Sequence, residues 1–331
     1  MNQPLRIGAY EYPRVLLGAG CGNVDGSGWR YHKLLPWSLL GDYWNDPRGI
    51  FQTKGLTDGR VGNLGLLDDG ITTKKILPDC ITGEPFTPQL NNSVGLSGLP
   101  YWEYYAKGIL RDRELPFAIQ YIATAEEPEG RIEQTQQFAT ACIEYFPSLK
   151  VRPLIFLGGG CPNVAHKSTF AWEFCEEVRI LKTTGSSVGV NFSPIVDIDL
   201  ALEVAEVADV LAPVNTISYD WMYENDSVFP FGKISPLVKR GYTCGGISSP
   251  RCRKHGLRTC KEIRAHNKKI ILFGGPGILY PWHIDEFVEV CDGIQIAALL
   301  PIMRPFKPLL DWVLNRAANA KWRLPRESWG A

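Results

Sequence analysis

The sequence lacks the features that mark several large classes of protein. Lysine plus arginine equals aspartate plus glutamate, at 35 residues each, so there is no basic excess of the kind that favours nucleic acid or an anionic membrane. No apolar run is long enough to span a bilayer, and the first twenty residues, MNQPLRIGAYEYPRVLLGAG, contain no signal-peptide core. We therefore expect a cytoplasmic protein that binds neither nucleic acid nor membrane.

Familiar metal-binding patterns are missing as well. The nine cysteines form no CxxC pair, and the regular spacing of Cys244, Cys252 and Cys260 matches no common zinc or iron–sulfur pattern. The five histidines show no HxH or HExxH arrangement. We expect no metal site, and we expect most of the cysteines to be buried thiols.

The chain does contain a repeated pattern of an apolar strand, a glycine-rich or polar loop and an amphipathic helix. Its 331 residues suffice for one large α/β barrel or for two ordinary domains. The pattern predicts eight strands, over residues 14–20, 49–56, 117–123, 151–157, 186–193, 210–217, 268–275 and 293–300. It predicts helices over residues 131–146, 168–185, 199–209, 249–267, 280–291 and 305–318.

These strands are almost continuously apolar, which is typical of a parallel sheet that is covered on both faces. Eight strand–helix units indicate an α/β fold, a (β/α)8 TIM barrel. A doubly wound open sheet is the alternative, but no GxGxxG motif follows the first strand. Residues 56–115 are richer in Gly, Pro, Asp and Asn, and we interpret them as an excursion over the barrel mouth between strands two and three. The whole chain, 1–331, is then a single domain.

The helical periodicity also predicts which side chains face inward. It places Ile143 on the buried face of the 131–146 helix, together with Ala139 and Cys142. It places Phe170 on the buried face of the 168–185 helix, together with Phe174.

Barrels of this kind carry their chemistry where strands end and loops begin. The stretch FLGGGCPNV, residues 156–164, follows strand four, and its Cys161 is either a packed small hydrophobe or a placed thiol. Lys54 lies at the end of strand two, where it either stabilises negative charge or forms a salt bridge. The amides of Asn92, Asn163 and Asn215 suit a cyclic imide or amide ligand, although each asparagine alone is also typical of a turn.

Glycines recur at two further loops. They lie at 244–250, in CGGISSP, and at 274–278, in GGPGI after strand seven. Backbone N–H groups at such loops can bind a phosphate group, and tight turns are the other interpretation.

Seven segments, in order along the chain, resemble motifs of the dihydroorotate dehydrogenase family of flavin barrels. The resemblance extends roughly from Val15 to Leu314. The segments are FQTKGLTDGRVGN (51–63), NSVGLSGLP (92–100), GGGCPNV (158–164), VNTI (214–217), GGISSPRCRKHGL (245–257), GGPGI (274–278) and IQIAAL (294–299). Each motif is modest alone, and their order at the predicted strand ends favours the shared fold.

The resemblance implies bound FMN, a homodimer, and Cys161 as the catalytic residue that moves a proton. It implies that the substrate is held by Lys54, Asn92, Asn163, Asn215 and Thr216, where Thr216 replaces the family's usual serine. It implies cofactor contacts from Ala19, Gly20, Lys54, Asn191, Asn215, Gly245, Gly246, Gly274, Gly275, Gly277, Ala297 and Ala298.

Two positions depart from the family pattern. Gly158 stands where the family has an asparagine that touches substrate and flavin, and Asn191 stands where it has a lysine that supports the flavin. A site that loses hydrogen-bond partners discriminates against its former ligand. We therefore expect an FMN-dependent oxidoreductase that interconverts C–C and C=C bonds next to a carbonyl, acting on a cyclic or unsaturated carbonyl compound. The alternatives are a true soluble dihydroorotate dehydrogenase of pyrimidine biosynthesis and a non-redox barrel that binds a phosphorylated ligand.

Overall fold

The eight predicted strands close into one barrel. In the computed structural model they pair in chain order, and every pairing is parallel. The barrel strands are β3 (Val15–Leu17), β5 (Ile50–Gln52), β9 (Phe117–Tyr121), β10 (Leu154–Gly158), β11 (Val188–Phe192), β12 (Val210–Pro213), β15 (Ile271–Gly274) and β16 (Gly293–Ile296). The (β/α)8 barrel is confirmed, and the open doubly wound sheet is wrong because β16 pairs with β3.

The structure describes most of the chain. The described residues are 4–18, 23–25, 30–31, 46–75, 78–84, 87–159, 170–226, 232–242, 245–296 and 307–322.

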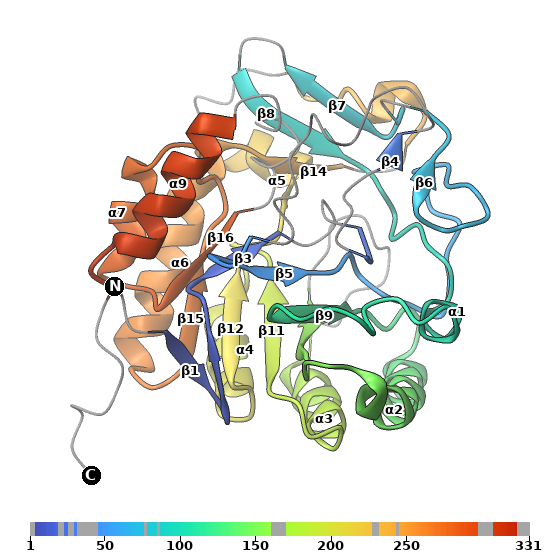
Figure 1. Ribbon diagram of the computed structural model, residues 1–331. Helices are drawn as coiled ribbons and strands as arrows, with labels where there is room; N and C mark the ends of the chain where they lie inside the picture. The colour runs from blue at the N-terminus through green and yellow to red at the C-terminus, as the bar shows by residue number, and fades with distance from the viewer. Residues whose placement is uncertain are drawn as a thin grey trace.

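Six helices cover the outside of the barrel, each close to a range predicted from the sequence (Figure 1). They are α2 (Pro128–Tyr145), α3 (Ala171–Lys182), α4 (Ile198–Ala205), α6 (Arg253–His266), α7 (Trp282–Val288) and α9 (Lys307–Asn319). Two shorter helices are α1 (Tyr101–Ala106) and α5 (Tyr219–Asn225). Single 3₁₀ turns are η3 (Phe146–Ser148), η4 (Val238–Arg240) and η5 (Pro250–Cys252).

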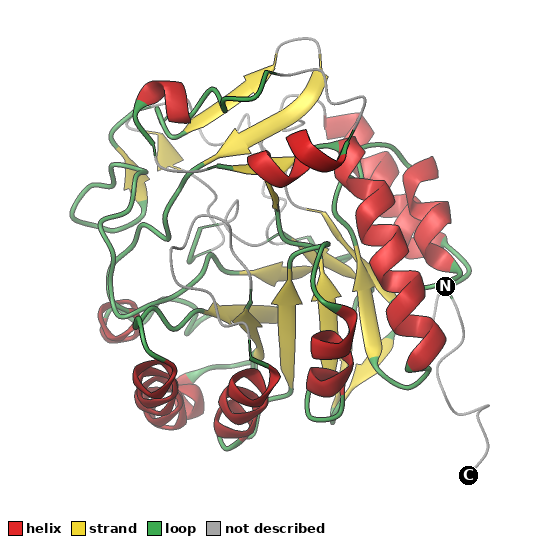
Figure 2. Cartoon of the chain, turned by 180° about the vertical axis from the view of Figure 1, so that it is seen from behind, coloured by secondary structure: helices red, strands yellow, loops and turns green. Residues whose placement is uncertain are grey.

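The excursion between strands two and three lies over the carboxyl end of the barrel. Its hairpin, β7 (Ile81–Glu84) and β8 (Thr87–Asn92), pairs with β14 (Gly246–Ser248), and β14 pairs with β13 (Ile217–Ser218). In Figures 1 and 2 this antiparallel sheet lies beyond the arrowheads of the barrel strands. Two segments that are far apart in the sequence therefore build one cover over the mouth. A small pair, β4 (Arg30–Tyr31) and β6 (Thr72–Thr73), adds to it.

The opposite end of the barrel is closed by an amino-terminal hairpin, β1 (Leu5–Ile7) and β2 (Tyr10–Tyr12). Leu5, Ile7 and Tyr12 join a buried apolar cluster with inward side chains of the barrel strands, such as Phe156 and Phe273. Alternate residues of the same strands point outward and pack on the helices in a second cluster. The amino end of the barrel, its base, is therefore a filled core, and the mouth is at the carboxyl end of the strands.

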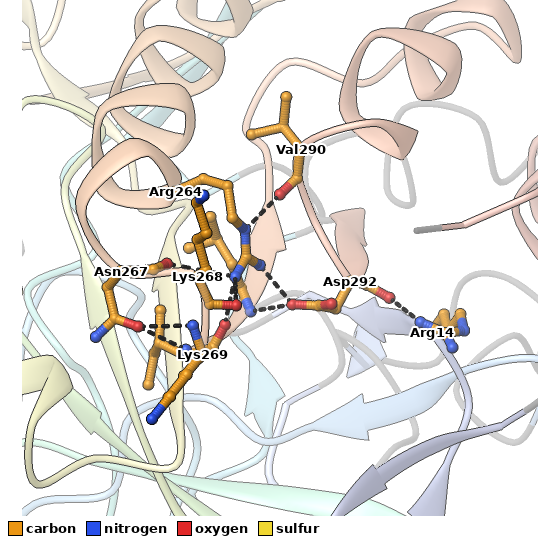
Figure 3. Close-up of polar contacts among 9 residues, drawn as sticks. Arg14, Arg264, Asn267, Lys268, Lys269, Val290 and Asp292 are labelled. Carbon is orange, nitrogen blue, oxygen red and sulfur yellow. Dashed lines mark hydrogen bonds and ion pairs between the residues drawn. The ribbon is translucent and has the colours of Figure 1, made fainter. Parts of the chain in front are cut away.

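A buried ion pair ties the last helix–strand unit to the first strand (Figure 3). Arg264 of α6 donates to Asp292 Oδ2 at 2.6 Å, and the same oxygen accepts from the Leu272 amide of β15 at 2.9 Å. The Arg14 guanidinium, just before β3, donates to the Asp292 carbonyl at 2.7 Å. The network joins β15, β16 and β3 at the amino end of the barrel, next to the seam where the barrel closes.

Two of the predicted helix faces are wrong in part. The side chain of Ile143 is 49% exposed and that of Phe170 is 53% exposed. The buried face of α2 instead carries Arg131 and Thr135 with Phe138, Ala139 and Cys142. Polar side chains that bond one another between α2 and α3 occupy part of the inward face. The buried face therefore differs from the one that the apolar pattern predicts.

The described cysteines agree with the expectation from the sequence. Cys80, Cys142, Cys175, Cys252, Cys260 and Cys291 are all free, buried thiols. Within the same described ranges, no helix has the length and apolar character needed to cross a bilayer.

A carboxyl group is buried between α2 and α3. Arg131 and Glu173 form a two-pronged ion pair, and Glu177 lies one helical turn further along α3. The Thr135 hydroxyl lies 2.7 Å from Glu177 Oε1 and 2.9 Å from the Arg131 carbonyl. Burial raises the pKa of Glu177 to about 8, with the Glu173 carboxylate acting in the same direction. The folded protein therefore holds a proton on Glu177 at neutral pH, and the unfolded chain does not.

We expect this proton to make stability depend on pH. Because the pKa in the folded state lies above the ordinary value of 4.5, the contribution is present at pH 4.5 and is lost as pH rises through about 8. The wild type should lose up to about 1.4 kcal/mol per pH unit in this window relative to Glu177→Gln, whose amide mimics the protonated acid. Urea unfolding at pH 5, 6.5 and 8 measures the difference, and an equal pH slope in the two proteins would contradict it.

Candidate functional site

Four amide side chains line the inside of the barrel at its mouth. Gln52, Gln120, Asn191 and Gln295 each lie two residues beyond an inward position of their strand, so the alternation of a strand points them inward as well. All four are buried, with at most 5% exposed. The described inward positions of the barrel strands carry no charged residue. The interior therefore changes from apolar at the base to neutral and polar at the mouth.

These amides are only partly hydrogen-bonded. Gln295 Nε2 donates to Gln52 Oε1 at 2.9 Å, across the first strand. Gln52 Nε2, Gln295 Oε1 and Asn191 Oδ1 have no partner among the described residues, although each atom is buried. Buried polar atoms in native proteins nearly always have a partner, so unpaired ones in a barrel mouth indicate a ligand or bound water.

Gly158 and Asn191, the two departures from the family pattern, are direct partners in the register of β10 and β11. A Cβ at Gly158 would lie 2.5 Å from Ile122 Cγ1 and 3.2 Å from Gln120 Nε2. The Ile122 side chain therefore occupies the room that a residue larger than glycine would need at position 158. The two substitutions alter one local patch of the mouth.

Lys54 is buried and bonded to the excursion. Its Nζ donates to the carbonyls of Ser97 at 2.9 Å and Gly70 at 3.1 Å, and it lies 5.5 Å from the centre of the Tyr104 ring. The Tyr104 hydroxyl donates to the same Gly70 carbonyl. The hydrogen bonds of Lys54 therefore link the excursion over the mouth to the end of β5.

The environment of Lys54 favours the neutral amine. Burial lowers the pKa of Lys54 to about 7, and the negative charges of Asp25 and Asp69 only partly oppose that effect. The amine is therefore able to gain or lose a proton near neutral pH. A group with that property at a barrel mouth is suited to proton exchange or to a ligand whose charge changes.

The sheet over the mouth brings together residues from two predicted motifs. Asn92 at the end of β8 pairs with Gly246 of β14, and the Asn92 Nδ2 donates to the Gly246 carbonyl at 3.5 Å. The neighbouring Gly245 carbonyl accepts from the Tyr219 amide. The loop after β12 is held separately, because Asn215 Oδ1 accepts from the Thr216 amide at 2.8 Å.

The glycines after β15 are needed for packing and backbone shape. A Cβ at Gly274 would lie 2.4 Å from the Phe287 ring of α7. Gly275 has a φ of 156°, and a Cβ there would lie 3.1 Å from Val214 Cγ1, while Gly277 has a left-handed φ of 82°. A Cβ at Gly275 would also lie 3.3 Å from the backbone carbonyl oxygen of Gln295, so β15 ends close to the main chain of β16.

Several predicted site residues lie outside the described residues. They are Cys161, Asn163, Ala19, Gly20, Ala297 and Ala298. In the part of the chain that the structure describes, no cluster of three or more His, Cys, Asp or Glu residues could hold a metal ion.

Sequence reasoning missed the three glutamines. Gln52, Gln120 and Gln295 each interrupt an otherwise apolar strand, and that interruption was the available signal. An isolated polar residue in a buried strand has to face a partner or a ligand, because leaving it unpaired costs free energy.

The sequence matches no protein-family model and no curated protein. Among solved structures, a dihydroorotate dehydrogenase from Eimeria tenella, in complex with ferulenol, matches with a TM-score of 0.63 and 9% identity over 95% of this chain and 83% of that chain. The tryptophan synthase α2β2 complex from Pyrococcus furiosus matches with a TM-score of 0.39 and 11% identity over 67% of this chain and 77% of that chain. The first likeness shows a shared barrel fold.

We expect Lys54 to give stability a pH dependence opposite to that of Glu177. Its pKa of about 7 in the folded state lies below the ordinary value of 10.5, so the unfolded chain binds more protons between these values and stability rises with pH there. Relative to Lys54→Met, the wild type should gain up to about 1.4 kcal/mol per pH unit from pH 7 to pH 10.

Urea unfolding at pH 7 and pH 9.5 tests this expectation. Lys107→Met, at an exposed lysine, is the matched control and should follow the wild type. If Lys54→Met also follows the wild type, Lys54 is charged in the folded protein at both pH values and the expectation is wrong.

Proposed function

We propose that the protein is an FMN-dependent oxidoreductase that interconverts a C–C single bond and a C=C bond next to a carbonyl. One observation carries the proposal. Five of the seven motif segments begin within or directly after strands of the closed barrel, and the other two meet where Asn92 pairs with Gly246 in the sheet above it. A dihydroorotate dehydrogenase shares this barrel fold.

The described residues at the mouth fit a flavin ring. Asn191 offers a buried carbonyl oxygen without a partner among the described residues, which suits a ring N–H group. We propose that Lys54, Asn191 and Asn215 contact the ring.

The remaining contacts are proposed from the motif segments. The backbone around Gly245, Gly246 and Gly274–Gly277, with Ala19, Gly20, Ala297 and Ala298, would hold the rest of the cofactor, including its phosphate. When bound, FMN supplies hydride exchange at its N5 atom with one carbon of the substrate.

The chain itself has to move one proton and hold the substrate. We propose that the Cys161 sulfur exchanges a proton with the carbon next to the one that exchanges hydride, since a thiol donates and a thiolate accepts. Asn92, Asn163, Asn215 and Thr216 would bind the substrate carbonyl and N–H groups. The sheet over the mouth would keep water from the reacting atoms.

The substrate we propose is a small cyclic or unsaturated carbonyl compound other than dihydroorotate. Asn191 replaces a cation of the family, and Gly158 replaces an amide, so the ligand loses a charge partner and a hydrogen-bond partner. We further propose a homodimer, on the strength of the family resemblance, and a cytoplasmic location, as we expect from the sequence.

The first test is for the cofactor and for Cys161. The purified protein should be yellow and release FMN into the supernatant on heating. Cys161→Ala should keep the colour and slow flavin reduction by its substrate by roughly 10²-fold or more, the usual scale for losing a general acid or base. Stopped-flow flavin absorbance against a panel of unsaturated and saturated cyclic carbonyl compounds measures the rate.

The matched control is Cys142→Ala, at a buried thiol on the outside of the barrel. It should lower thermal stability and leave the rate unchanged. A colourless protein that takes up no added FMN would remove the redox function and leave a barrel that binds a phosphorylated ligand. An unchanged rate in Cys161→Ala would remove Cys161 from the mechanism.

The second test restores the family pattern. Because Ile122 occupies the room beside Gly158, Gly158→Asn requires a smaller residue at 122. The triple variant Ile122→Ala, Gly158→Asn, Asn191→Lys should bind orotate at least roughly tenfold more tightly than the wild type, since it regains one amide and one cation. Ile122→Ala alone, which only adds space, is the control. Efficient turnover of dihydroorotate by the wild type would show that the departures do not change the substrate.

A further inference from the structure

The Gln52–Gln295 pair is an incomplete hydrogen-bonding unit in the barrel interior. The two side chains come from β5 and β16, 243 residues apart, and are 0% and 5% exposed. Their single bond uses the Gln52 carbonyl and the Gln295 N–H group. Gln52 Nε2 and Gln295 Oε1 are buried and have no partner in the described structure.

This conclusion does not depend on how the amides are oriented. A half-turn of a glutamine amide group exchanges the positions of its nitrogen and oxygen. If both amides are flipped, Gln52 becomes the donor and Gln295 the acceptor, and the unpaired atoms are then Gln52 Oε1 and Gln295 Nε2. In either orientation the pair offers one amide nitrogen and one amide oxygen that have no partner among the described residues. Each of them belongs to one of the two amide groups that the hydrogen bond joins.

A free donor next to a free acceptor is expensive to bury. Each unsatisfied buried polar group lowers the free energy of unfolding by about 1–3 kcal/mol. If the pair had no function, apolar residues at these two positions would make the protein more stable. Leu16 pairs in the register with Gln295 on one side and, on the other, with Ile50, two residues before Gln52. Phe156 and Phe273 belong to the apolar cluster that fills the interior below them. These apolar neighbours cannot satisfy the free atoms, so the missing partners have to come from the mouth.

We propose that the Gln52–Gln295 pair binds the amide edge, –CO–NH–, of a heterocyclic ring that enters the barrel mouth. The ring's carbonyl accepts from the free N–H group, and the ring's N–H group donates to the free carbonyl. A ring of this class pairs with both atoms and carries no charge, which agrees with the absence of charged residues at the described inward positions of the strands.

Two molecules of the proposed function could supply such an edge. One is the flavin ring and the other is a cyclic amide or imide substrate. The identification of the ring as flavin or substrate rests on the proposed function. The hydrogen bonding between the two glutamines and an amide edge does not.

The experiment compares ring probes that differ only in the N–H group. Isothermal titration of the wild-type protein freed of bound cofactor measures FMN against 3-methyl-FMN, and uracil against 1,3-dimethyluracil. We expect at least one methylated probe to bind roughly 10-fold to 100-fold more weakly than its parent. If the flavin pair discriminates, the ring is the cofactor's, and if only the uracil pair discriminates, it is the substrate's.

A double variant identifies the residues. Gln52→Met/Gln295→Met removes both amides at similar volume, and it should abolish the preference for the N–H probe while stability stays equal or rises. Thr135→Val, which removes a buried hydroxyl between α2 and α3, is the matched control and should lower stability with the preference intact.

The outcomes separate the two proposals. Failure to bind FMN together with N–H-dependent binding of uracil would remove the flavin function and retain the pair as a ring site. FMN binding with no effect of either methylation, an unchanged preference in the double variant, or a wild type that binds neither parent probe would each overturn the assignment of the pair.

Discussion

Closure of the barrel is the constraint on which the rest of the molecule depends. β16 has to pair with β3, at the opposite end of the strand order, before the inward side chains share one interior. The buried pair of Arg264 and Asp292 stabilises that seam, because Asp292 also accepts from the Leu272 amide and its carbonyl accepts from Arg14. A carboxylate with these partners recovers the cost of leaving water, and an unpaired one at this position would destabilise the seam strongly. The Gln52–Gln295 bond exists only because this seam is closed.

Closure also divides the interior into two levels. The amino-terminal hairpin fills the base with apolar side chains, so the base behaves as a core whose packing sets stability. At the other end the same alternation presents amides, and the sheet formed by β13, β14, β8 and β7 lies above them. Lys54 links the levels, because its backbone follows β5 and its amine holds the carbonyls of Gly70 and Ser97. A change at Lys54 therefore acts on the cover and on the mouth together.

The strands and their order could be predicted from the sequence because a buried parallel strand is apolar along its whole length, and that signal is local. The excursion could be recognised by composition, but its pairing with β14 depends on contacts between residues more than 150 positions apart. The faces of α2 and α3 were partly wrong for a related reason. Arg131 faces inward because it bonds Glu173, and Glu177 faces inward because it bonds Thr135. The apolar pattern of the sequence does not reveal such hydrogen-bonded pairs. At the site, Asn92 and the glycines could be recognised as motif residues. Gln52 and Gln295 also lie in motif segments, but their hydrogen bond depends on the closed barrel that brings them together.

The lack of charge at the described inward positions of the strands has a consequence for the chemistry of a ligand that binds there. A carboxylate placed among Gln52, Gln120, Asn191 and Gln295 would meet amide dipoles and no described cation on the strands, and the desolvation of an unpaired charge costs far more than that of a neutral polar group. Lys54 does not change the balance, because its pKa of about 7 leaves the amine only partly charged and its hydrogens already bond Gly70 and Ser97. An uncharged ring with a carbonyl and an N–H group avoids this cost. Each of its polar atoms can pair with a side-chain amide atom that has no partner among the described residues. Asn191, where the motifs that this chain resembles carry a lysine, and the glutamine pair would therefore act in the same direction: under the proposed function, both would favour an uncharged amide-bearing ring over an anion.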